Sequence, residues 1–374
     1  MGEEFTMNDS YLNTFGKLFF NIDENDEVKE IIEQASHVLA SLITKFGEVE
    51  NELCYGTSRQ DDFIDTVLCL FIRKIMEQLD TINVLFSIGS FSQAQIILRS
   101  LIENIVSLEF ILKSDTKKRA AAYWLEHHYQ EIELGEEIFD VESEYQKQII
   151  ENKGKEAYDE DLKKFQKKKE ALARIIKSKP VFQEIDNNRK MKLSLKKKKS
   201  KNVFMHWYEV CSDVKSFKGM MKETGYEMYY SSIYGGLSYE THALNSTMDM
   251  SIGTDGICLK PIRNPINGST TFCLACTFSI GCLKKIYEYL KDGEDEKREF
   301  QKYFLNFQKK RDIVCNNLDM IKWEAPVPVP GKKTLVPDSA SSEGRAIRQV
   351  EILSNKLLTT AFEASLECVT VICC

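Results

Sequence analysis

Two sets of polar side chains fall within otherwise apolar helical patterns, and their types and spacing suit phosphate chemistry. Arg99 and Glu103 are four positions apart, about one α-helical turn, inside the mostly apolar residues 96–112. A charge in such a helix is costly unless it is paired. One interpretation is a narrow solvated stripe, or a structural ion pair between helices. The other is an arginine held by a glutamate in a cleft, where it binds a phosphate or polarises a scissile bond.

The second set is a row of five residues at intervals of four: Tyr226, Tyr230, Tyr234, Ser238 and His242. Each step of four turns a side chain by about 40° on an α-helix, so Tyr234, Ser238 and His242 share a face. A phenol, a hydroxyl and an imidazole in one row suit acid–base chemistry. The alternative is an aromatic core ridge that ends at a surface histidine.

A run of four lysines is a third candidate for contact with phosphates. Lys196, Lys197, Lys198 and Lys199 are consecutive, and clustered lysines bind RNA or other phosphates. No aromatic residues for base stacking alternate with them, which also fits a solvated loop.

Metal and cofactor sites are not expected. His127 and His128 follow Arg119, but adjacent positions on a helix point to different faces and do not converge on one ion. Cys273 and Cys276 lie in an apolar helix, where cysteine usually packs as a small hydrophobe, and a second ligand pair is missing. The sequence also has no Gly-rich phosphate loop, nucleophile elbow or H-E-x-x-H motif.

The charge distribution is uneven. The net charge is -7, yet residues 153–201 hold eighteen Lys and Arg against seven Asp and Glu. A basic arm on an acidic body is therefore expected. The eleven cysteines are scattered, which indicates reduced thiols in the cytoplasm, and no apolar run reaches the about 18 residues of a membrane span.

Proline placement and apolar periodicity predict an all-α fold, a bundle of about eight helices with a long charged helical arm. No proline precedes Pro180, which suits long helices. Helices are predicted over about 28–43, 63–82, 91–112, 115–139, 142–178, 226–246, 270–290 and 296–323. Residues 185–201 are expected to form a loop, and residues 257–265 an irregular or short extended stretch.

The expected domain organisation has four parts. Residues 1–25 form an N-terminal leader or extension, and residues 26–324 the bundle, with the basic arm at 142–201. Residues 325–346 form a Pro- and Ser-rich linker, and residues 347–374 a C-terminal amphipathic helix. The apolar face of that last helix needs to be buried on the body, on a second copy or on a partner protein.

The segments Ile97-Leu98-Arg99-Ser100-Leu101-Ile102-Glu103 and Tyr234-Gly-Gly-Leu-Ser238-Tyr-Glu-Thr-His242 together resemble a bacterial helical family, the domain of unknown function five-six-seven-seven. That family is similar in style to the HEPN proteins, many of which are RNases of toxin–antitoxin and phage-defence systems. The resemblance implies a catalytic Arg and His four to six residues apart, in a site usually completed across a dimer. A homodimer is expected here because the apolar helical faces outnumber what one small bundle hides. This chain departs from that spacing, so Arg99 and His242 need to be brought together by folding.

Two functions are therefore expected. The first is an RNA-directed effector, a metal-independent endoribonuclease of the toxin or phage-defence type. Its catalytic set would be Arg99, Glu103, Tyr234, Ser238 and His242, with His242 as acid and base and Arg99 stabilising the phosphoryl charge. The alternative is a non-catalytic sensor or scaffold in which the same residues form a polar lock or a small-ligand pocket.

Overall fold

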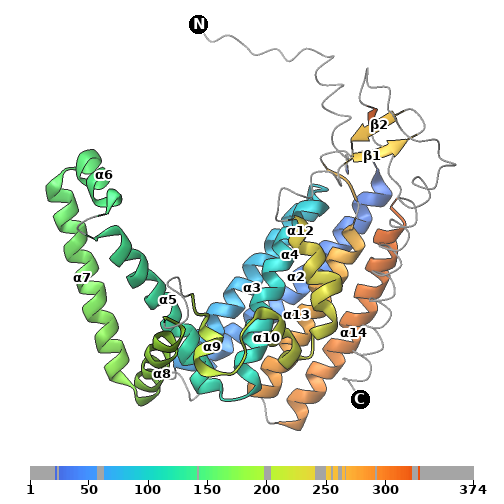
Figure 1. Ribbon diagram of the computed structural model, residues 1–374. Coiled ribbons are helices and arrows are strands. Elements are labelled where there is room, and N and C mark those ends of the chain that lie inside the picture. The colour runs from blue at the N-terminus through green and yellow to red at the C-terminus, as the bar shows by residue number, and fades with distance from the viewer. Residues whose placement is uncertain are drawn as a thin grey trace, which may run out of the picture. The chain divides into compact units, whose positions relative to one another are not determined.

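The fold is that of a computed structural model, and it is almost entirely helical (Figure 1). The structure describes residues 22, 25–56, 63–140, 143–197, 204–240, 250–253, 256–259, 263–265, 267–290, 293–321 and 327–328. Within these ranges, eight helices are 18 residues or longer, which confirms the predicted all-α bundle. No helix in the described part of the chain is long and apolar enough to cross a membrane.

The chain divides into two compact units. Unit 1 comprises residues 1–56, 71–109 and 221–374, and unit 2 comprises residues 57–70 and 110–220. The predicted bundle of residues 26–324 is therefore split between two units, with the basic arm of residues 142–201 inside unit 2.

Unit 1 is built on long helices that lie side by side (Figure 1). They are α2 (Asp26–Asn51), α13 (Gly268–Leu290), α14 (Glu294–Asp319), and most of α3 (Phe63–Ser87) and α4 (Phe91–Lys113). The α2 helix begins at Asn25, whose side chain accepts a hydrogen bond from the Val28 amide at 3.1 Å. Its buried residues recur every three or four positions, which gives one continuous apolar face against the bundle.

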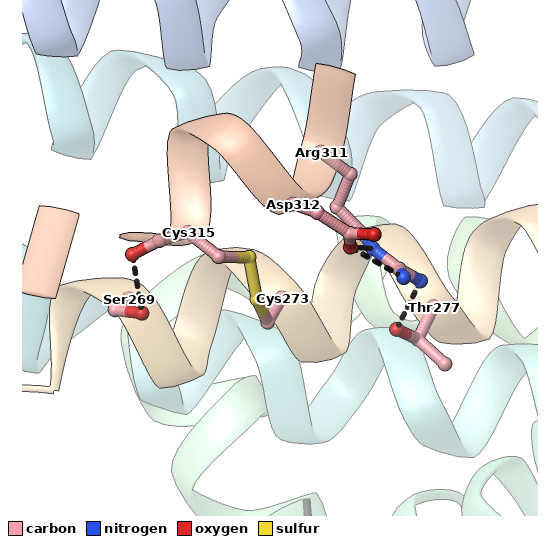
Figure 2. The surroundings of a disulfide bond; sticks show 6 residues. All are labelled: Ser269, Cys273, Thr277, Arg311, Asp312 and Cys315. Atoms are coloured by element: carbon pink, nitrogen blue, oxygen red, sulfur yellow. Dashed lines mark hydrogen bonds and ion pairs between the residues drawn. A yellow bond between two sulfur atoms is a disulfide. The ribbon is translucent and has the colours of Figure 1, made fainter. Parts of the chain in front are cut away.

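A disulfide joins α13 to α14, and Figure 2 shows its surroundings. Cys273 and Cys315 have their Cα atoms 6.2 Å apart, and the Ser269 hydroxyl donates to the Cys315 carbonyl at 3.0 Å. The expectation of reduced thiols is wrong for this pair, because two packed helices bring together cysteines that are 42 residues apart in the sequence. Cys276 is a buried free thiol that packs as predicted. Its burial raises the pKa of the thiol.

Unit 2 contains α5 (Thr116–Ile138), α6 (Glu144–Lys153), α7 (Lys155–Ser178), α8 (Pro180–Lys197) and α9 (Trp207–Cys211). The short α10 (Phe217–Thr224) runs from unit 2 into unit 1. The core of unit 2 includes Leu125 from α5, Leu172 from α7, and Phe182 and Ile185 from α8. The helices α5, α7 and α8 pack on one another, and a single residue, Lys179, connects α7 to α8.

The predicted single helix over residues 142–178 is two helices. Ser143 begins α6 by accepting a hydrogen bond from the Gln146 amide at 3.1 Å. Gly154 then takes a φ of 85°, which only glycine adopts readily, and α7 begins directly after it. The break therefore follows from one glycine within an otherwise helical pattern.

The predicted loop over residues 185–201 is wrong for residues 185–197, which belong to α8. The two adjacent asparagines favoured a loop, but burial of Phe182 and Ile185 stabilises the helix instead. Two polar side chains of α8 are also held, because Asp186 accepts from the Tyr129 hydroxyl at 2.8 Å and Arg189 pairs with Glu133 at 2.6 Å. Tertiary contacts thus outweigh local helix propensity.

The predicted helix over residues 226–246 is wrong in its geometry. It consists of α11 (Glu227–Tyr229), the π-helix η3 (Tyr230–Tyr234) and α12 (Gly235–Glu240). The wide π turn is closed by the Gly235 amide, which donates to the Tyr230 carbonyl five residues earlier. Residues 241–249 lie outside the described residues, so the last part of this prediction stays a prediction.

A small antiparallel sheet accompanies the helices. Strands β1 (Met250–Gly253) and β2 (Gly256–Leu259) pair with each other, and β3 (Val327–Pro328) pairs with β2. The extended stretch expected over residues 257–265 is thus a strand at its start. Of the predicted linker 325–346, only β3 is described, and the predicted helix over residues 347–374 lies outside the described residues.

Substitution of alanine for glycine is expected to have opposite effects at two helical positions, Gly135 and Gly47. A Cβ on Gly135 of α5 would overlap the ring of Phe165, which stacks on Phe139 with centroids 5.2 Å apart. A Cβ on Gly47 of α2 would meet only the Met76 sulfur, at an ordinary 3.8 Å. Overpacking costs about 1–3 kcal/mol, whereas alanine in an unobstructed helix gains about 1 kcal/mol over glycine.

We therefore expect Gly135→Ala to lower the free energy of unfolding by about 1 kcal/mol and Gly47→Ala to raise it by about 1 kcal/mol. Urea denaturation followed by circular dichroism measures both. Equal shifts of the two variants in the same direction would contradict the packing around Gly135.

Candidate functional site

The α4 helix positions the first pair of candidate residues at the edge of the unit 1 core. Leu98, Leu101 and Ile102 are fully buried. The side chains of Arg99 and Glu103, which neighbour these buried residues in the sequence, remain 21% and 42% exposed. Arg99 Nε donates to Glu103 Oε1 at 3.3 Å, which forms the ion pair that the four-residue spacing predicted.

The η3–α12 segment brings two further side chains to the same arginine. Arg99 Nη2 donates to the Tyr234 hydroxyl at 3.2 Å, and Arg99 Nη1 donates to Ser238 Oγ at 3.1 Å. The guanidinium carbon also lies 4.9 Å from the centre of the Tyr234 ring. Tyr234 and Ser238, which are 135 and 139 positions from Arg99 in the sequence, thus hold its guanidinium group.

The Tyr234 phenol closes the network. Its hydroxyl donates to Glu103 Oε1 at 2.5 Å while it accepts from Arg99. Burial, followed by the hydrogen bond to Glu103, raises the pKa of Tyr234 to about 12. The phenol therefore stays protonated at neutral pH and serves as a fixed donor to the carboxylate. We call Arg99, Glu103, Tyr234 and Ser238 the Arg99 cluster.

The π turn explains how this row of residues is split. Tyr230 stacks on Tyr234 with ring centroids 5.5 Å apart, so it supports the Arg99 cluster from the side. Tyr226 lies before the π turn and instead donates to Glu109 Oε1 at 2.8 Å inside the core. The sequence did not predict this second Tyr–Glu pair, although Glu109 stands out as a charge in the apolar pattern of α4.

The pair of tyrosines allows a matched prediction. Tyr226→Phe leaves the buried Glu109 carboxylate without its phenol donor, which costs about 1–3 kcal/mol of stability. Tyr234→Phe acts on a half-exposed cluster, where water replaces the lost bond, and should cost less than about 1 kcal/mol. Urea denaturation of the two variants checks the order, and a larger loss for Tyr234→Phe would contradict it.

His242 lies outside the described residues, as do Lys198 and Lys199. The structure therefore brings Arg99, Glu103, Tyr234 and Ser238 together and leaves the position of His242 a prediction from sequence. Ser238 is the last described side chain of the row.

One lysine of the run, Lys196, contacts other residues of unit 2. Lys196 Nζ pairs with Glu209 at 2.6 Å and donates to the Phe204 carbonyl at 3.1 Å. Lys197 ends α8, and nothing is described of its side chain. Lys196 thus has a structural role between α8 and α9 that its place in a basic run did not indicate.

Arg119 packs inside unit 2, on the α5 helix that also carries His127 and His128. Arg119 is buried, donates to the Phe110 carbonyl at 2.6 Å and covers the Phe110 ring at 3.7 Å. Burial and the neighbouring His127 lower the pKa of His128, so it is neutral at pH 7. Over the described ranges, no group of three or more His, Cys, Asp or Glu residues could hold a metal ion.

Comparison with known proteins identifies a family. The model of the Family of unknown function (DUF5677) matches residues 65–257, a range that includes every member of the Arg99 cluster and His242. No curated protein and no solved structure matches the chain. The comparison therefore supports the family expected from the two short motifs and assigns no activity.

Proposed function

The chain belongs to the Family of unknown function (DUF5677), and from its own residues we propose that it is an RNA-directed effector, a metal-independent endoribonuclease. The observation that carries the proposal is the guanidinium of Arg99, which three side chains hold in place while it remains partly exposed. A guanidinium fixed before the substrate arrives stabilises developing phosphoryl charge without reorganisation.

The reaction proposed for this site uses the RNA itself as nucleophile. The 2′-oxygen attacks the adjacent phosphorus, the bond to the 5′-oxygen breaks, and a 2′,3′-cyclic phosphate and a 5′-hydroxyl end result. His242 accepts the proton of the 2′-hydroxyl and returns it to the leaving 5′-oxygen. Arg99 binds the phosphate oxygens, whose negative charge grows in the transition state.

Glu103, Tyr234 and Ser238 act as positioning residues in this scheme. Each bonds the guanidinium, and the Tyr234–Glu103 hydrogen bond fixes the two relative to each other. The effector is further proposed to act in the cytoplasm, as a homodimer and as a toxin or in phage defence. Light scattering in solution gives the oligomeric state, and a monomer at all concentrations would contradict the homodimer.

Expression in bacteria tests the proposed activity. We expect the wild-type chain to be toxic and to cause degradation of cellular RNA, and His242→Ala to relieve both at equal protein levels. Ser194→Ala, on the exposed end of α8, is a control that should remain toxic. Intact RNA in cells that produce soluble wild-type protein would contradict the proposal.

A second candidate function, a non-catalytic sensor or scaffold, is favoured by one observation. The four side chains of the Arg99 cluster already hydrogen-bond one another and thereby tie α4 to the η3–α12 segment, as a polar lock would. In this case His242→Ala leaves any cellular phenotype intact, while removal of residues 339–374 abolishes it by deleting the docking segment. The opposite pattern supports the ribonuclease.

A further inference from the structure

The α7 helix of unit 2 carries two groups of cations that differ in their partners. Lys168 and Lys169 turn toward α5 and pair with Glu131 at 3.0 Å and Glu136 at 2.7 Å. The second group is exposed to solvent, and among the described residues no hydrogen bond or ion pair holds any of its side chains: Lys163, Lys167, Arg174 and Lys177.

These four cations share one side of α7. Successive residues of an α-helix turn by about 100°, which places the four within a sector of about 80°. Tyr158, Phe165 and Leu172, which α7 buries, lie on the opposite side at intervals of seven. We call the four cations the α7 basic face; one exposed anion, Glu170, lies among them.

The dimensions of the α7 basic face fit a linear polyanion. From Lys163 to Lys177 the helix rises about 21 Å at about 1.5 Å per residue. A nucleic-acid duplex carries about one negative charge per 1.7 Å of its axis, so about a dozen phosphates lie within this length. All four cations can therefore contact one duplex at the same time.

Other anionic partners fit less well. A membrane-binding helix inserts an apolar face beside its basic one, but the apolar side of α7 is buried in the core of unit 2. A single strand is held by stacking of bases on aromatic rings, but the aromatic residue of this stretch, Phe165, is buried on the opposite side of α7. Phosphate contacts alone are typical of sequence-independent binding to a double helix.

We propose that the α7 basic face binds double-helical nucleic acid through its phosphates. This inference goes beyond the proposed ribonuclease, because it concerns binding by unit 2 and requires no cleavage. It also moves the expected phosphate contacts from Lys196, which pairs with Glu209, to four cations that pair with no carboxylate among the described residues.

Fluorescence anisotropy of labelled duplexes with the full-length chain tests the inference. The probes are a DNA duplex and a 2′-O-methyl RNA duplex, which lacks the 2′-hydroxyl and resists the proposed cleavage. A variant with Lys163, Lys167, Arg174 and Lys177 all changed to Gln removes the α7 basic face. The matched control changes four exposed lysines of unit 1 to Gln: Lys29, Lys302, Lys309 and Lys310.

We expect the wild type and the control to bind at least one duplex, and the α7 variant to bind it at least about tenfold more weakly at about 0.1 M salt. The slope of log K against log salt should become shallower by about 3 to 4, because about four counterions fewer are released. Binding to one duplex only tells which nucleic acid is preferred.

Three results would overturn the proposal. The first is a wild type that binds neither duplex, and the second is an equal loss of affinity in the α7 variant and the control. The third is binding to anionic phospholipid vesicles that the α7 variant loses while duplex binding is unchanged. Circular dichroism confirms that both variants stay folded, and loss of ribonuclease activity alone leaves all of these measurements unaffected.

Discussion

Arg99→Ala is expected to lower the rate of RNA cleavage by about 100- to 1,000-fold, the usual effect of removing one preorganised donor to a developing negative charge. The substitution also removes the partner of Glu103, Tyr234 and Ser238, but these side chains keep access to water at the edge of unit 1. The fold should therefore persist while the chemistry is lost. Single-turnover cleavage of a labelled RNA gives the rate.

Two controls separate charge from position. Arg99→Lys keeps the positive charge but cannot make the three bonds of the guanidinium, so it should recover only part of the rate. Tyr234→Phe removes the hydrogen bond to Glu103 and should lower the rate less than Arg99→Ala. If Arg99→Ala cleaves as fast as the wild type, Arg99 has no catalytic role.

Reduction of the disulfide between Cys273 and Cys315 should lower the free energy of unfolding by about 4 kcal/mol. The estimate follows from the entropy of closing a loop of 42 residues in the unfolded chain. Both cysteines are buried between α13 and α14, so their loss also loosens the packing around Ser269. Urea denaturation with and without a thiol reductant measures the difference.

The double variant Cys273→Ser/Cys315→Ser is the control, because the reductant should leave its unfolding midpoint unchanged. Cys54 is exposed and is not part of the disulfide, so Cys54→Ser should respond to the reductant as the wild type does. An unfolding midpoint of the wild type that is the same in both conditions would contradict a stabilising disulfide.

The helical fold was predictable because its signals are local. Apolar residues at intervals of three and four gave α4, α13 and α14 to within a few residues. The errors lie where tertiary contacts outweigh local propensity. Phe182 and Ile185 stabilise α8 through two asparagines that favour a loop, and a single positive-φ glycine, Gly154, divides the charged arm.

Four of the residues named from the sequence, Arg99, Glu103, Tyr234 and Ser238, lie together, but their geometry was not predictable. The spacing of Arg99 and Glu103 predicted the ion pair, and the row at intervals of four named Tyr234 and Ser238 on the η3–α12 segment. The π-helix η3 was not predictable, because residues at intervals of four do not reveal the extra residue in its turn. Neither was the disulfide, since no local pattern relates α13 to α14.

Incubation of a single-stranded RNA with purified wild-type protein in the presence of EDTA tests the central claim most directly. The proposed mechanism predicts fragments that end in a 2′,3′-cyclic phosphate, no cleavage of the same RNA with 2′-O-methyl groups, and a loss of about 100-fold or more with Arg99→Ala. RNA that stays intact with the wild type, or fragments that form equally with Arg99→Ala, would contradict it.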